Sequence, residues 1–125
     1  MENLEPLIGF VLAQAQALGI DSNTSGQLHL VSEEALVNVI KYAYPGGSGD
    51  IEIACGGDNG SFVLEIRDTG IPFNPLSLPE PDTTLPMEQR KIGGLGIFMI
   101  RKVMDSVVYK RDGGHNVLTL SKHVE

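Results

Sequence analysis

The segment from Leu28 to Tyr44, LHLVSEEALVNVIKYAY, is the part of this chain that most constrains its fold. At 3.6 residues per turn four polar residues fall on one narrow stripe, and apolar side chains lie on both sides of that stripe. The stripe consists of Gln27, Glu34, Asn38 and Lys41. A helix that is apolar nearly all round is usually buried, which predicts a central core helix. This helix alone favours a solvated polar face, but a carboxylate and a carboxamide one turn apart would be costly to desolvate without a partner, a metal ion or a ligand.

Composition limits the kind of protein that the chain can be. With 125 residues, 42% of them hydrophobic, we expect one compact domain over residues 1–125. The net charge of −7 argues against nucleic acid as a partner and requires any phosphate site to be local. The lone Cys55 cannot form an internal disulfide, which favours a reducing compartment. Because neither a signal peptide nor an apolar run long enough for a membrane helix is visible, we expect a cytoplasmic protein without membrane contact.

Hydrophobic periodicity and turn signals divide the chain into helices and strands. The expected elements are a helix over Leu4–Leu18, a second helix capped by Ser25 and reaching Tyr44, strands over Asp50–Gly56 and Ser61–Arg67, a proline-rich loop from Thr69 to about Met87, a helix from about Leu95 to Asp105, and strands over Ser106–Lys110 and Asn116–Lys122. Hairpins alternating with helices predict a two-layer α/β sandwich. Its sheet is expected to be antiparallel or mixed, mainly antiparallel, with helices packed on one face.

A glycine cluster, KIGGLG, leads from Lys91 to Gly96 into the third helix. A helix start with bare glycine backbone offers N–H donors and a positive dipole end to phosphates. The two commonest glycine motifs for phosphate do not fit, because no Lys-Ser or Lys-Thr follows and no strand precedes in a βαβ unit. A hinge before a core helix is therefore about as good an interpretation of this cluster alone.

Asp68 stands where the second strand ends, and Thr69 and Gly70 follow it. A carboxylate at a strand end can accept a hydrogen bond from an exocyclic amine such as adenine N6. An ordinary turn aspartate is the alternative interpretation.

Taken together and in order, three motifs resemble the Bergerat-fold (GHKL) ATP-binding superfamily. The motifs are Glu34-x-x-x-Asn38, then Asp68-Thr69-Gly70-x-Pro72-Phe73-Asn74-Pro75, then Gly93-Gly94-Leu95-Gly96. More narrowly, the pattern is similar to that of bacterial anti-sigma-factor serine/threonine kinases, which switch partners with STAS-domain antagonists. The resemblance covers nearly the whole chain from the first helix onward, and the order of the three motifs makes it specific.

The resemblance implies a role for each matching residue. Asn38 would hold a Mg²⁺ ion that bridges the ATP phosphates, and Glu34 would act as general base. Asp68 would read adenine N6, and Gly70 would let the base approach. The proline-rich loop would be the ATP lid. The remaining ATP-binding candidates are the upstream Arg90 and Lys91, the phosphate turn Gly93, Gly94, Leu95 and Gly96, and Thr119 as a support of the adenine pocket.

The resemblance also implies binding partners, and the sequence departs from the family's pattern at two places. The resemblance implies a STAS-domain anti-anti-sigma protein and a sigma factor as partners and leaves a homodimer open. Lys41 and Tyr42 stand near the place of a family histidine, and Ile92 stands where active members tend to have an arginine. The alternative is therefore a non-catalytic nucleotide-binding regulatory module. A histidine kinase domain is disfavoured, because no dimerisation helices with a phospho-acceptor histidine precede the motifs.

Overall fold

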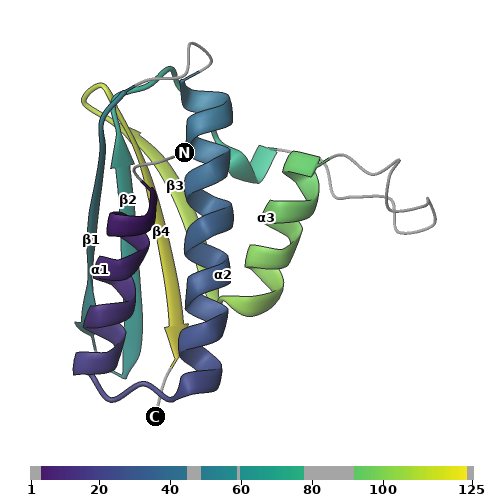
Figure 1. Ribbon diagram of the computed structural model, residues 1–125. Helices are drawn as coiled ribbons and strands as arrows, with labels where there is room; N and C mark the ends of the chain where they lie inside the picture. The colour runs from purple at the N-terminus through teal and green to yellow at the C-terminus, as the bar shows by residue number, and fades with distance from the viewer. Residues whose placement is uncertain (1–3, 45–48, 59, 78–91, 124–125) are drawn as a thin grey trace, which may run out of the picture.

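The computed structural model of the chain describes residues 4–44, 49–58, 60–77 and 92–123. Figure 1 shows helices on one side of a sheet. The elements are α1 (Leu4–Ala17), α2 (Ser22–Asn38), the π-helix η1 (Val39–Ala43), β1 (Ile51–Asp58), β2 (Ser61–Asp68), the 3-10 helix η2 (Pro75–Ser77), α3 (Ile92–Val103), β3 (Ser106–Asp112) and β4 (His115–His123). The predicted two-layer α/β sandwich is confirmed, and every strand pair between described residues is antiparallel.

The sheet joins two hairpins through their second strands, in the order β1-β2-β4-β3. The β2–β4 register places Asp68, the last residue of β2, opposite Asn116. On the other side of β4, Asn116 is opposite Arg111 of β3. One end of the sheet therefore brings side chains from three strands together, although the residues are far apart in sequence.

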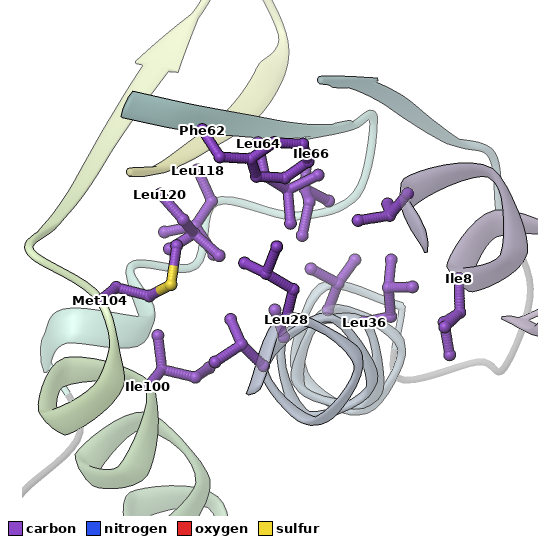
Figure 2. Close-up of a cluster of buried hydrophobic side chains, with 14 of the residues drawn as sticks. Ile8, Leu28, Leu36, Phe62, Leu64, Ile66, Ile100, Met104, Leu118 and Leu120 are labelled. Atoms are coloured by element: carbon purple, nitrogen blue, oxygen red, sulfur yellow. The ribbon is translucent and has the colours of Figure 1, made fainter. Parts of the chain in front are cut away.

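The core lies between the sheet and α2. Alternate side chains of β2 are buried because helices cover one face of the sheet, and on β4 the residues that share this face, Asn116, Leu118 and Leu120, are buried together with Val117. Figure 2 shows Phe62, Leu64, Ile66, Leu118 and Leu120 of the sheet together with Leu28 and Leu36 of α2 and with Ile100 and Met104 from α3 and the residue after it. The prediction that the segment from Leu28 onward is a central core helix is confirmed.

The second helix begins earlier than its sequence pattern predicted. Asp21 is the N-cap, and its carboxylate accepts a hydrogen bond of 2.7 Å from the backbone N–H of Thr24. Hydrogen bonds from Thr24 hold the pKa of Asp21 below its ordinary value. The prediction of Ser25 as the cap is wrong, because the polar segment 22–25 itself forms the first turn of α2.

Two observations bear on the expectations from composition. Cys55 lies on β1, half-buried against the core, and burial raises the pKa of its thiol. Across the stretches of chain with described coordinates, no helix is long and apolar enough to cross a membrane.

Candidate functional site

Asp68 is a buried carboxylate at the end of β2, with 3% of its surface exposed. Its Oδ1 atom accepts two hydrogen bonds, one of 2.8 Å from the N–H of Gly70 and one of 2.9 Å from Nδ2 of Asn116. Its Oδ2 atom has no hydrogen bond to any described residue. One oxygen of this carboxylate is thus fixed by the protein, and the other is available to a ligand.

Gly70 brings the turn after β2 against the end of η1. The N–H of Ile71 donates a hydrogen bond of 3.0 Å to the carbonyl of Ala43. A Cβ atom at position 70 would lie only 2.3 Å from that carbonyl oxygen. The chain therefore needs glycine here for backbone packing, whereas the expected approach of an adenine base to Gly70 stays a prediction.

Asn38 is the last residue of α2 and is 4% exposed. Its Nδ2 donates a hydrogen bond of 2.8 Å to the carbonyl of Glu34, which fixes the side chain against its own helix. Within the described part of the chain, no hydrogen bond involves Oδ1 of Asn38. Glu34, one turn earlier, is half-buried. The helix thus presents an amide oxygen and a carboxylate at neighbouring positions.

The helix widens into the π-helix η1 directly after Asn38. Such π-turns are rare and frequently occur at functional sites. The sequence analysis predicted one continuous α-helix here, because a shift in the backbone hydrogen-bond pattern leaves the apolar periodicity almost unchanged.

Two tyrosines at the end of this helical segment, Tyr42 and Tyr44, contact the loop that follows β2. The hydroxyl of Tyr44 accepts a hydrogen bond of 2.8 Å from the N–H of Thr69 and donates one of 2.5 Å to the carbonyl of Asp50. The ring of Tyr42 stacks on Phe73, with centroids 4.8 Å apart and planes 20° apart. Tyr42 therefore packs against the residue that forms one wall of the pocket described next.

Asn38 and Asp68 line the same pocket, although Glu34 is not among its lining residues. The cavity volume of this pocket is about 10 Å³, about the space that one water molecule needs. The other lining residues are Ala35, Val39, Phe73, Pro75, Ile97 and Leu118, which are apolar, with Tyr109 and Asn116. An apolar cavity with a few convergent polar atoms is the usual character of a ligand site.

Asn116 lines the pocket, and the sequence analysis did not assign it a role there. Thr119 does not line the pocket. It lies three residues from Asn116 on the same strand, and strand alternation places it on the opposite face of the sheet. Its role as a support of the adenine pocket stays a prediction. The strand period indicates which face it occupies, because Asn116 and Leu118 share the face that is buried.

The predicted phosphate turn belongs to α3. The helix begins at Ile92, three residues before the predicted start, so that Gly93, Gly94, Leu95 and Gly96 are part of its first turns. The first four N–H groups of a helix have no partner within it and remain available to an anion. Arg90 and Lys91, and the segment 78–91 of the predicted lid, lie outside the described residues.

The fold and the pocket define an α/β sandwich with a pocket between a central helix and one end of its sheet. The chain belongs to the histidine kinase-like ATPase domain family, whose model matches residues 1–122. It is 30% identical over 97 residues to the serine/threonine-protein kinase BtrW of Bordetella bronchiseptica, covering 77% of this chain and 68% of that protein. It is 26% identical over 115 residues to the serine-protein kinase RsbW of Bacillus mycoides, covering 89% of this chain and 71% of that protein. The resemblance drawn from the three motifs is therefore confirmed at the level of the family.

Solved structures confirm the fold. The structure of the SiaB–SiaC complex from Pseudomonas aeruginosa matches with a TM-score of 0.59 and 15% identity, over 97% of this chain and 83% of that one. The histidine kinase AdeS of Acinetobacter baumannii matches with a TM-score of 0.58 and 17% identity, over 81% of this chain and 47% of that one.

Proposed function

We propose that this chain binds ATP with Mg²⁺ in the described pocket and transfers the terminal phosphate to a serine or threonine of a STAS-domain anti-anti-sigma protein. In the same proposal it is an anti-sigma factor, which binds a sigma factor or the STAS protein in alternation. Membership of a kinase family supports the transfer, and the motif pattern supports the choice of partners.

The observation that carries the proposal is a pair of acceptor oxygens left free in one pocket. Oδ1 of Asn38 and Oδ2 of Asp68 belong to buried residues and have no hydrogen bond to the described residues. An amide oxygen is a suitable Mg²⁺ ligand, and a carboxylate oxygen accepts from an amine. The apolar walls suit the faces of a purine. Mg²⁺ keeps few protein ligands and shares the rest with phosphate and water, which fits a single asparagine.

Asn38 and Glu34 would have different roles in the reaction. Asn38 would hold the ion, which supplies charge neutralisation on the phosphates. Glu34, half-buried and one turn away, would accept the proton of the attacking hydroxyl. Phosphoryl transfer depends mainly on positioning and charge stabilisation, so one base and one metal ligand are a sufficient protein contribution here.

The second candidate is a nucleotide-binding regulatory module that does not transfer phosphate. Ile92 favours it, because the first residue of α3 is an isoleucine, whereas the family resemblance implies an arginine there in active members. In this case nucleotide and partner would bind without turnover.

The test is a transfer assay with labelled ATP, Mg²⁺ and a purified STAS-domain protein encoded near this chain's gene. We expect a labelled partner with the unchanged chain and no label with Glu34→Ala, while ATP binding by the variant is retained. Glu33→Ala is the matched control, because Glu33 is adjacent, exposed and turned to another side of α2. It should transfer phosphate as the unchanged chain does.

Three results separate the candidates. Equal transfer by Glu34→Ala would remove Glu34 from the mechanism. Partner binding without any transfer by the unchanged chain would select the regulatory module. Absence of ATP binding would contradict both.

A further inference from the structure

We propose that Asn116 is a positioning residue for base recognition, which orients Asp68 so that only its Oδ2 atom faces the base. The inference deepens the proposed function and rests on it, since it concerns how the same pocket selects adenine. Asn116 lies on β4, is 4% exposed and lines the pocket.

The carboxamide of Asn116 makes four hydrogen bonds. Its Nδ2 donates to Oδ1 of Asp68 at 2.9 Å and to the carbonyl of Ile71 at 2.8 Å. Its Oδ1 accepts from the N–H of Phe73 at 3.1 Å and from the hydroxyl of Tyr109 at 2.6 Å. A carboxamide has two N–H donors and two acceptor lone pairs, so its hydrogen-bonding capacity is fully used.

The polarity of these partners fixes which way the amide points. The backbone carbonyl of Ile71 and the carboxylate of Asp68 can only accept, and the N–H of Phe73 can only donate. A flipped amide would place its oxygen against two acceptors and its NH₂ group against a donor. Asn116 therefore presents an N–H to Asp68 in any arrangement that keeps these contacts.

This donor has a direct consequence for the carboxylate. Oδ1 of Asp68 accepts a hydrogen bond of 2.8 Å from the N–H of Gly70. The bond from Asn116 is the second hydrogen bond to the same oxygen atom. The carboxylate is thereby held at two points, and Oδ2 is the oxygen left for the pocket. An ionised oxygen accepts from an amino group and is repelled by a carbonyl oxygen. Asp68 held in this way should select a 6-aminopurine against a 6-oxopurine.

Sheet register places Asp68 and Asn116 next to each other. Asp68 and Asn116 are direct partners on adjacent antiparallel strands, so their backbones hold the two side chains close together. Tyr109 and Arg111 lie on β3, which forms a hairpin with β4, the strand that carries Asn116. Arg111 donates a hydrogen bond of 2.9 Å to the carbonyl of Gly70, on the same turn, but has no bond to Asp68 or Asn116.

The experiment compares the affinities for ATP and inosine triphosphate, whose base carries a 6-oxo group, by calorimetric titration in the presence of Mg²⁺. Asn116→Ala removes the donor, and Asn116→Asp keeps the shape but replaces the donor with an oxygen. We expect both variants to weaken ATP binding about tenfold or more, as is typical for a lost hydrogen bond to a charged group, and to change binding of inosine triphosphate little. The ratio of the affinity for ATP to the affinity for inosine triphosphate should therefore fall about tenfold or more.

Arg111→Ala is the matched control, because it loosens the same turn without touching the Asp68 carboxylate. This variant should lower the affinities for ATP and for inosine triphosphate by the same factor, so that the ratio of the two affinities is unchanged. In an Asp68→Ala background, the further change Asn116→Ala should leave the ratio unaltered, since Asn116 would have nothing left to position.

Two outcomes would overturn the inference. Equal loss of both affinities in the Asn116 variants would assign the residue a structural role only, and the near-isosteric Asn116→Asp variant covers the case in which Asn116→Ala fails to fold. A further drop of the ratio in the Asp68→Ala background would show that Asn116 acts without Asp68. Absence of ATP binding by the unchanged chain would instead overturn the proposed function, a result that the unmodified protein alone reveals.

Discussion

Replacing Gly70 with alanine is expected to destabilise the fold, because the turn after β2 approaches η1 too closely for a side chain. The new Cβ would lie 2.3 Å from the carbonyl oxygen of Ala43 and 2.8 Å from its carbonyl carbon. Both atoms are backbone, so the turn or the helix end must move. That movement would lengthen the bond of 3.0 Å between Ile71 and Ala43.

The magnitude follows from two contributions. Overpacking typically costs about 1–3 kcal/mol, and a lost backbone hydrogen bond adds about 1 kcal/mol. We therefore expect the free energy of unfolding to fall by about 2–4 kcal/mol. For a chain of this length, the melting temperature should fall by roughly 4 °C for each kcal/mol.

The assay is urea denaturation followed by circular dichroism. Gly26→Ala is the matched control, because Gly26 lies within α2 and a Cβ there would have no atom within 4 Å apart from the backbone of its own helix and its chain neighbours. This control should raise the free energy of unfolding by about 0.5–1 kcal/mol, since alanine is the better helix former. A stability of Gly70→Ala equal to that of the unchanged chain would refute the account of the turn.

Three further changes test local features of the fold. Ser32→Ala should stabilise the protein by about 1 kcal/mol, because the Ser32 hydroxyl is fully buried and has no hydrogen-bond partner among the described residues, and thermal unfolding would measure the gain. Tyr44→Phe should lower the free energy of unfolding by about 1–3 kcal/mol through loss of the bonds to Thr69 and Asp50, and an unchanged urea midpoint would contradict this. Asp21 has a lowered pKa in the folded state, so its contribution is present above the unfolded pKa of about 3.9 and is lost as the pH falls through the folded value. Asp21→Asn should keep a cap but flatten the pH dependence of stability in this acid range, as seen in unfolding at a series of pH values.

The fold could be predicted because the buried positions repeat with clear periods. Alternation over Phe62, Leu64 and Ile66 defined β2 to within one residue, and turn residues defined both hairpins. The least accurate bounds were helix ends. At Asp21 and Ile92 the end depends on which backbone groups are capped, and the periodicity of apolar residues carries little information about that.

The site was predictable only in part. Asn38 and Asp68 were assigned from motifs, and the order of the elements brings them to one pocket. Asn116 was missed because its role depends on its register opposite Asp68, and register across two hairpins is not visible in a local pattern. Thr119 was assigned from its place in a motif without its strand face, and its role stays a prediction. The π-helix depends on backbone hydrogen bonds and leaves no compositional signal.

The most direct test of the proposed Mg²⁺–ATP site is an ATP titration with and without Mg²⁺, carried out on the unchanged chain and on Asn38→Ala. The account predicts that Mg²⁺ strengthens ATP binding by the unchanged chain and has no such effect on the variant, because Asn38 supplies the protein ligand. The same increase with Mg²⁺ in the variant, or no ATP binding by the unchanged chain, would contradict it.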